Sequence, residues 1–185
     1  MSSVLNTPIR PEDVRPFKVG DVVYINGVIF TARDKAHVKM LSDPQRPFSL
    51  HNACIYHSGP LIVKEEYTYR VIASGPTTSA RMNEQTPAIV KQGVTAIIGK
   101  GGMSREVAHS LIGRCFYLAF PGGCGILARE RIEEVLNVYY AELGFTEAVW
   151  KLRVRDFGPL LVAIDSYGES IYEKIQASSR ERPHQ

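Results

Sequence analysis

The stretch VTAIIGKGGMSREVAHSLIGRCFYLAF, residues 94–120, indicates the fold class of this chain. Its two ends, VTAIIG (94–99) and CFYLAF (115–120), are short apolar runs without polar alternation, as expected of strands buried on both faces. Between them, REVAHSLIGR has helical spacing, and Ser104 stands directly before it as an N-cap. A strand, a helix and a second strand in this order predict an α/β fold with a sheet core.

The segments before this stretch extend the predicted sheet. In VVYINGVIFTA (22–32), Asn26-Gly27 separates two β-rich runs, which predicts an N-terminal β-hairpin because a type I′ turn needs positive φ at both central residues. Residues 1–17 are polar and contain Pro8, Pro11 and Pro16, so we expect an irregular lead-in. The other expected elements are a helix at 33–42 and strands at 61–64 and 69–74.

The C-terminal half alternates in the same way. Thr86-Pro87 is typical of a helix start, and PGGCG (121–125) is expected to be a loop. ARERIEEVLNVYYAELG (128–144) is predicted to be a long amphipathic segment with a solvated charged helix face. A strand at 158–166, a helix at 167–180 and a frayed tail at 178–185 complete the pattern, which predicts a single domain over residues 18–177.

Composition restricts the classes of function. The chain has 185 residues, 44% hydrophobic and 22% charged, which is typical of an ordinary globular protein. Its formal charge of +3 is too small and its basic residues too scattered for nucleic-acid binding. No apolar run reaches the about 18–20 residues that would span a bilayer, so we expect no membrane contact. The absence of an apolar signal core and the three cysteines favour a reducing, cytoplasmic location.

A candidate anion site lies in GPTTSARM, residues 75–82, directly after the apolar run YRVIAS. A turn between a strand and a helix presents free N–H groups and the positive end of the helix dipole. Thr77 and Arg81 are four residues apart and would share a helical face, where a hydroxyl and a guanidinium suit a carboxylate. An N-cap threonine followed by a solvated arginine would explain the same residues.

Two further cations follow expected strands. Lys100 comes directly after the run 94–99 among Gly99, Gly101 and Gly102, but no Walker A or dinucleotide motif is present. Arg33 follows the run 22–32, with Asp34 beside it. Arg33, Arg81 and Lys100 could converge on a small dianion, or each could be a solvated surface residue.

Five ordered motifs carry a resemblance to a known family. They are KVGDVVYINGVIFTARDKAH, IYHSGP, GPTTSARM, IIGKGGM and EAVWKLRVRDFGPLLVAIDSYG. In this order they resemble the β subunit of two-subunit class I fumarate hydratases, the C-terminal domain of the single-chain enzymes, and the related β subunit of L-tartrate dehydratase. The resemblance implies a swivelling β/β/α fold, three-layered with a mixed sheet.

The resemblance also implies a reaction and its partners. The family hydrates fumarate reversibly to L-malate with a [4Fe-4S] cluster, whose one iron not bound by cysteine is a Lewis acid for the substrate hydroxyl. The cluster would be held by an α subunit and not by this chain, whose Cys54, Cys115 and Cys124 match no cluster motif. We therefore expect a fumarase-type α partner, a small dicarboxylate substrate, a dimer of heterodimers, and no metal in this chain.

By the same resemblance, individual residues receive roles. Arg33, Arg81 and Lys100 would bind the substrate carboxylates, and Thr77 would be the base at the carbon that loses or gains a proton. A threonine hydroxyl is a poor base unless neighbours activate it, so a group of the partner subunit is the alternative. Asp34, His37 and Thr78 would support these residues.

Several alternatives stay open at this point. The substrate could be tartrate in place of fumarate, because G-K-G-G stands here where the single-chain enzymes often have A-K-G-N. The chain could be a stand-alone dicarboxylate-binding module, or a structural partner whose cations anchor a neighbouring subunit. A zinc site of His51, Cys54 and His57 is a further reading, although it lacks a fourth ligand.

Overall fold

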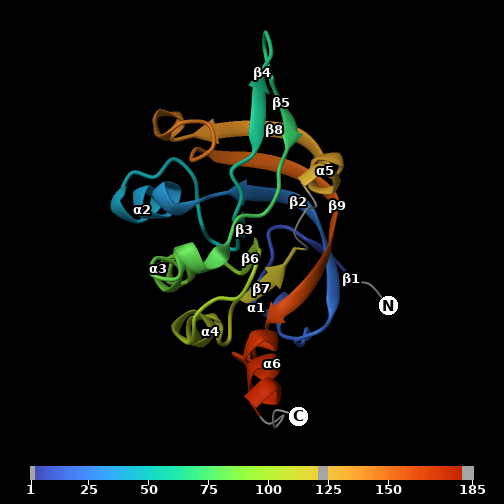
Figure 1. Ribbon diagram of the computed structural model, residues 1–185. Coiled ribbons are helices and arrows are strands. Elements are labelled where there is room, and N and C mark those ends of the chain that lie inside the picture. Colours follow the sequence, from blue (N-terminus) through green and yellow to red (C-terminus); the bar gives the residue numbers. More distant parts are fainter. Residues whose placement is uncertain (1–2, 121–124, 181–185) are drawn as a thin grey trace.

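The computed structural model describes residues 3–120 and 125–180, with side chains as far as residue 175. The described residues form an α/β fold with one main mixed sheet in the order β1-β2-β3-β6-β7-β9-β8 (Figure 1). Its strands are β1 (Ser3–Asn6), β2 (Val22–Thr31), β3 (Cys54–Tyr56), β6 (Ala96–Gly99), β7 (Phe116–Ala119), β8 (Ile132–Tyr139) and β9 (Val149–Ile164). A separate antiparallel hairpin consists of β4 (Leu61–Lys64) and β5 (Tyr69–Ala73).

The helices are α1 (Pro11–Val14), α2 (Asp34–Ser42), α3 (Thr86–Lys91), α4 (Arg105–Leu111), α5 (Gly125–Glu130) and α6 (Ile171–Arg180), with 3₁₀ turns η1 (Ser79–Met82) and η2 (Ala141–Leu143).

The long strand β9 closes part of the sheet on itself. It pairs antiparallel with β7 at one end and along β2 from Leu161 to Lys151. The strands β2, β3, β6, β7 and β9 therefore form a ring, and one apolar cluster that includes Phe116, Phe157 and Trp150 lies on its inner face. A second cluster joins residues of these strands to residues of α2, α3 and α4, three helices that lie along one side of the sheet in Figure 1.

Side chains of the central strands alternate between these two clusters. Ala96 and Ile98 of β6 belong to the inner cluster, whereas Ile97 belongs to the outer one. The Ser104 hydroxyl accepts a hydrogen bond from the Val107 amide at 3.3 Å and so caps α4. These findings confirm the strand–helix–strand prediction for residues 94–120.

The predicted N-terminal hairpin is wrong, because β2 runs without a turn through Asn26 and Gly27. Gly27 has a φ of +102° and lies where the register between β2 and β9 shifts, which is the geometry of a β-bulge. The Asn26 side chain accepts a hydrogen bond from the Asp156 amide of β9 at 2.6 Å. Pairing with one long partner strand along both halves of β2 outweighs the local turn signal.

The long amphipathic segment predicted at 128–144 also differs from the structure. Helix α5 ends at Glu130, and residues 132–139 form the edge strand β8, antiparallel to β9. Glu133 and Glu134 pair with Arg155 and Arg153 across the two strands, at 2.6 and 3.3 Å. Two of the charges predicted to lie on a solvated helix face, Glu133 and Glu134, thus form cross-strand ion pairs, which helical spacing alone could not reveal.

The N-terminal residues are more ordered than the predicted lead-in. Residues 3–6 form β1, which pairs parallel with β2, and residues 11–14 form the short helix α1. Helix α3 begins at Thr86, one residue before the predicted first helical residue Pro87, and Gln85 occupies the N-cap position predicted for Thr86. The predicted loop residue Cys124 and the last five residues of the predicted tail lie outside the described residues.

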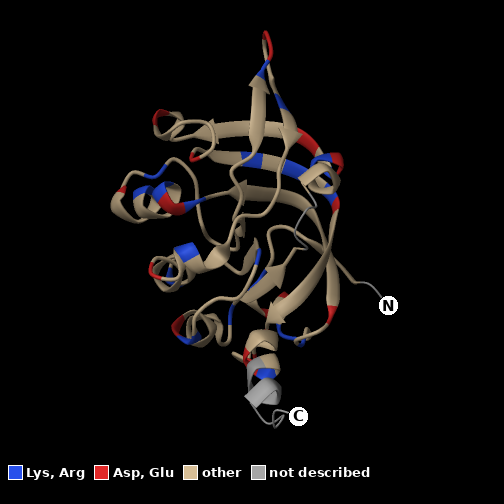
Figure 2. Ribbon diagram, in the orientation of Figure 1, with Lys and Arg blue, Asp and Glu red and all other residues tan. Residues whose placement is uncertain are grey.

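Charges of both signs are intermixed over the surface. Lys and Arg lie near Asp and Glu on α2 and α4 (Figure 2). Basic residues follow one another along β9 at 151, 153 and 155, and two of them pair with glutamates of β8 (Figure 2). Among the described residues, no helix is long and apolar enough to cross a bilayer.

Candidate active site

Three candidate segments meet where parallel strands end. β2, β3 and β6 are parallel neighbours, with Thr31 opposite Tyr56 and Tyr56 opposite Ile98. Arg33, His57 and Lys100 follow the carboxyl ends of these strands. The carboxyl ends of parallel strands commonly carry ligand sites, in closed α/β barrels as well as in open sheets.

The turn GPTTSARM reaches this edge from the hairpin β4–β5. The Thr77 amide donates to the His57 carbonyl at 2.7 Å, and the Ser79 amide donates to the Lys100 carbonyl at 2.9 Å. A β-bridge also joins Thr78 to Lys100. The backbone therefore holds Thr77 and Thr78, from one motif, against Lys100 from another, and Lys100 itself is exposed.

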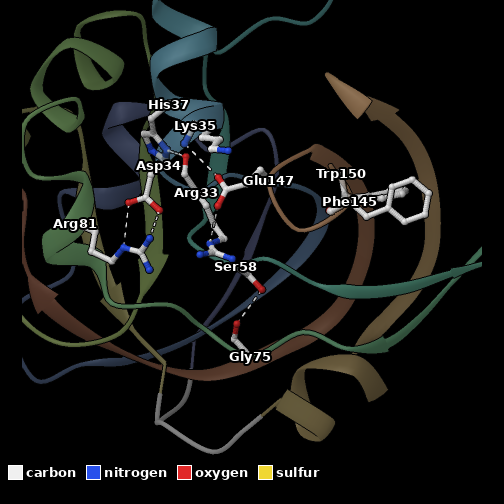
Figure 3. A network of polar contacts seen from close by, with 10 residues as sticks. All are labelled: Arg33, Asp34, Lys35, His37, Ser58, Gly75, Arg81, Phe145, Glu147 and Trp150. Carbon is white, nitrogen blue, oxygen red and sulfur yellow. Dashed lines mark hydrogen bonds and ion pairs between the residues drawn. The ribbon is translucent and has the colours of Figure 1, made fainter. Parts of the chain in front are cut away.

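The side chain of Arg81, a residue of η1, reaches the N-terminus of α2, where both carboxylate oxygens of Asp34 accept hydrogen bonds from its guanidinium (Figure 3). The Arg81 Nη2 to Asp34 Oδ2 distance is 2.6 Å, and Nε to Oδ1 is 3.1 Å. A two-point contact of this kind fixes the plane of a guanidinium. The Arg81 side chain is still 50% exposed, so it is accessible to a ligand.

Arg33 is held at the same helix end by a different carboxylate. Its Nε lies 3.4 Å from Glu147 Oε1, and the other Glu147 oxygen accepts from the Lys35 amide at 3.2 Å (Figure 3). The Arg33 side chain also runs along Gly59, where an added Cβ would lie 2.6 Å from Arg33 Cδ. The predicted cations Arg33 and Arg81 thus share the first turn of α2, because Asp34, the partner of Arg81, follows Arg33 in the chain.

His37 supports this turn rather than facing outward. Its Nδ1 lies 2.9 Å from the Arg33 carbonyl oxygen, and its ring is buried. Burial lowers the pKa of His37 to about 4, so the ring is neutral and Nδ1 donates its proton. The His57 ring meets it edge-on with 5.1 Å between centroids, and burial likewise lowers the pKa of His57.

The described cysteines do not fit an iron-sulfur cluster. Cys54 of β3 and Cys115, the residue directly before β7, are free, fully buried thiols, and burial raises the pKa of both. A thiolate ligand needs the opposite environment. In the described part of the chain no group of three or more His, Cys, Asp or Glu side chains could hold a metal ion, which also removes the His51–Cys54–His57 zinc reading.

A comparison with known protein families fits this arrangement. Residues 2–175, nearly the whole chain, match the family described as the fumarase C-terminus. The chain belongs to this family. The resemblance read from the five sequence motifs is thereby confirmed.

Relatives within the fumarase C-terminal family carry two kinds of name. “Putative L(+)-tartrate dehydratase subunit beta” of Methanocaldococcus jannaschii is 46% identical over 181 residues, which cover 94% of this chain and 93% of that protein. The L(+)-tartrate dehydratase subunit beta of Escherichia coli K12 is 35% identical over 187 residues, 98% of this chain and 92% of that protein. “Putative fumarate hydratase class I” of Geobacillus stearothermophilus is 42% identical over 181 residues, 96% of this chain but 35% of that longer protein.

Sequence reasoning missed several residues that organise the site of this fumarase C-terminal chain. Glu147 is far from Arg33 in the sequence and has no local signal. Ser79, within GPTTSARM, and Tyr117 of β7 form a buried contact, with 3.1 Å between their hydroxyl oxygens. Ser79 could have been suspected, since a hydroxyl follows two threonines in the same turn.

Proposed function

We propose that this chain is the β subunit of a two-subunit hydro-lyase that hydrates fumarate reversibly to L-malate. Its family and the subunit names of its relatives support a hydro-lyase subunit. The observation that carries the proposal is the β-bridge between Thr78 and Lys100, which joins two of the predicted motifs. The residues proposed for carboxylate binding and for proton transfer belong to these two motifs and to the motif of Arg33.

The cations are suited to a substrate with two carboxylates. Asp34 engages two N–H groups of Arg81, and a guanidinium has five, so three remain for a substrate oxygen. Asp34 therefore orients Arg81 and leaves it able to bind. In this proposal Arg81 and Lys100 bind the carboxylate next to the reacting carbon, and Arg33 binds the other carboxylate.

Proton transfer at the neighbouring carbon is assigned to Thr77. Removing the C3 proton of malate places negative charge on the adjacent carboxylate, which the bound cations stabilise. Two contacts support this assignment: the Thr77 amide donates to the His57 carbonyl, and the next residue, Thr78, bridges to Lys100. A neutral hydroxyl is a weak base, so a base from the partner is the alternative assignment.

The rest of the site is proposed to come from an α subunit that carries a [4Fe-4S] cluster, in a dimer of heterodimers. The described cysteines do not fit such a cluster, so the partner subunit would have to hold it. This proposal accounts for the open position of Arg81 and Lys100, which a second protein surface would cover. Without that surface we expect the chain to be inactive.

L-tartrate is the second candidate substrate. The tartrate dehydratase relatives cover more than nine-tenths of both chains, which is the observation that favours it. Tartrate carries the same two carboxylates as malate, so the same cations would bind it. The proposed clamp alone does not distinguish the two diacids.

The test is anaerobic co-expression of this chain with its α partner, followed by measurement of fumarate absorbance after addition of L-malate. Fumarate formation that requires both chains is the expected result. Activity on L-tartrate with none on L-malate would transfer the proposal to the second substrate. A chain that forms no complex yet binds fumarate or malate by calorimetry would be a stand-alone binding module, which contradicts the proposal.

A further inference from the structure

A buried polar network lies directly beneath the two motifs of the proposed site. The Ser79 hydroxyl oxygen lies 2.9 Å from His57 Nδ1, 3.1 Å from the Tyr117 hydroxyl and 3.3 Å from the Lys100 amide. The Tyr117 hydroxyl also lies 2.7 Å from the Gly101 carbonyl oxygen. Ser79 and His57 are fully buried, and the network reaches the carbonyl one residue beyond Lys100.

The positions of the protons in this network follow from its fixed end. The Gly101 carbonyl can only accept, so at 2.7 Å Tyr117 donates its one proton to it. The 3.1 Å contact to Ser79 also has a geometry in which Tyr117 would donate, but the one Tyr117 proton is used at the shorter contact to Gly101. The Tyr117 oxygen is therefore left to accept the Ser79 proton. With its own proton committed, the Ser79 oxygen accepts from the Lys100 amide and from His57 Nδ1, which must carry a proton.

The surroundings of the other His57 ring nitrogen, Nε2, are consistent with this order of protons. His57 Nε2 is buried and has no hydrogen-bond partner. With the proton on Nδ1, Nε2 is an unpartnered acceptor, whereas the reverse tautomer would leave an unpartnered N–H donor. Orphaned donors are the rarer of the two in buried sites. The reverse order would also place two lone pairs against each other between Tyr117 and Gly101.

We propose that His57 and Ser79 are positioning residues: His57, held as the Nδ1–H tautomer, fixes the Ser79 oxygen, which in turn holds the Lys100 amide against the Thr77–Thr78 turn. The consequence for catalysis rests on the proposed function, whereas the proton order does not. Gly99 supports the assignment, because Ser79 Oγ occupies the place where a side chain at Gly99 would begin. The two motifs are therefore joined by side chains as well as by their backbones.

The first experiment measures the tautomer in the full chain. ¹⁵N NMR of histidine-labelled protein at pH 7.5 distinguishes protonated from bare ring nitrogens. We expect His57, assigned by its loss in His57→Asn, to have a protonated Nδ1 and a bare Nε2. Ser79→Ala and Tyr117→Phe should each remove this signature, and Ser110→Ala, which loses a serine hydroxyl bonded to the Val107 carbonyl of its own helix, should keep it. A protonated Nε2 in the unchanged chain would overturn the proposal.

The second experiment measures catalysis in the assembled complex. A shift in the relative position of reacting groups costs up to about 100-fold in rate, so Ser79→Ala should lower kcat by about 10- to 100-fold with KM changed by about threefold or less. His57→Asn retains an N–H near the Nδ1 position and should keep most of kcat, whereas His57→Ala should not. Equal kcat in Ser79→Ala and the unchanged complex would contradict the positioning role. An unchanged complex that is inactive on every diacid would contradict the proposed function. The NMR experiment would still test the order of protons around Ser79.

Discussion

Two neutral histidines lie ring against ring beneath the candidate site, and their burial couples folding to pH. Burial lowers the pKa of His37 to about 4 and that of His57 well below its usual value. In the unfolded chain both would titrate near pH 6.5. Their contribution to the free energy of unfolding is therefore complete above pH 6.5, and it is lost as the pH falls and the unfolded state takes up protons that the folded state cannot.

We predict a loss of about 2–3 kcal/mol in the free energy of unfolding between pH 7 and pH 5.5, above the range in which most carboxylates titrate. His57→Asn should remove about half of that loss. The measurement is urea unfolding at each pH, with His109→Gln, a change at an exposed histidine on α4, as the matched control. A pH dependence in His57→Asn as steep as in the unchanged chain would show that His57 takes no part.

At the scale of the element, Gly99 shows why the end of β6 tolerates no side chain. It is a buried strand residue, and a Cβ at this position would collide with the Ser79 hydroxyl and lie 3.2 Å from His57 Nδ1. Because both neighbours are buried and hydrogen-bonded to each other, neither can move away freely.

Gly99→Ala should therefore lower the free energy of unfolding by about 1–3 kcal/mol, the usual cost of overpacking. Gly75→Ala is the control, since the nearest described atom to an added Cβ there is Gly125 Cα, at 3.6 Å. Thermal and urea unfolding of the two variants give the comparison. Equal stabilities would mean that the turn at Ser79 is loosely held.

The elements that the sequence predicted correctly are those whose signal is local and agrees with their tertiary setting. The run 94–99, the cap at Ser104 and the run 115–120 each give the right element, because burial on both faces leaves a continuous apolar pattern. Asn26-Gly27 and the segment 128–144 misled because their structure depends on β9, a strand that follows both in the chain. A bulge and a turn both call for a glycine with positive φ, so the residues alone do not separate them.

The candidate site divides in the same way. Arg33, Arg81 and Lys100 are predicted from the sequence because each lies in a recognisable motif after an expected strand. The carboxylates that pair with the two arginines lie at different places in the chain. Asp34, which pairs with Arg81, directly follows Arg33, whereas Glu147, which pairs with Arg33, lies in the loop before β9. The spacing of residues along the chain does not show which carboxylate pairs with which arginine, because the pairing depends on the three-dimensional fold.

At the scale of the whole molecule, the strand edge that carries Arg81 could serve either chemistry or assembly. Arg81 and Lys100 are exposed, as expected both of residues that meet a substrate and of residues that meet a neighbouring subunit. The ion pair of Arg81 with Asp34 lies at the surface, and such pairs contribute little to folding. A substitution there can therefore separate the two roles without unfolding the chain.

We predict that Arg81→Ala lowers kcat/KM of the assembled enzyme by about 100- to 1000-fold, the cost of removing one preorganised donor that stabilises developing charge. Size-exclusion chromatography with the α partner should show the same complex as the unchanged chain, and the free energy of unfolding should change by no more than about 1 kcal/mol. Arg70→Ala is the matched control, because Arg70 also pairs with a carboxylate, Glu65, but lies on the hairpin β4–β5. Loss of the complex with unaltered turnover per assembled molecule would assign Arg81 to assembly, and near-normal activity in an intact complex would remove it from the substrate clamp.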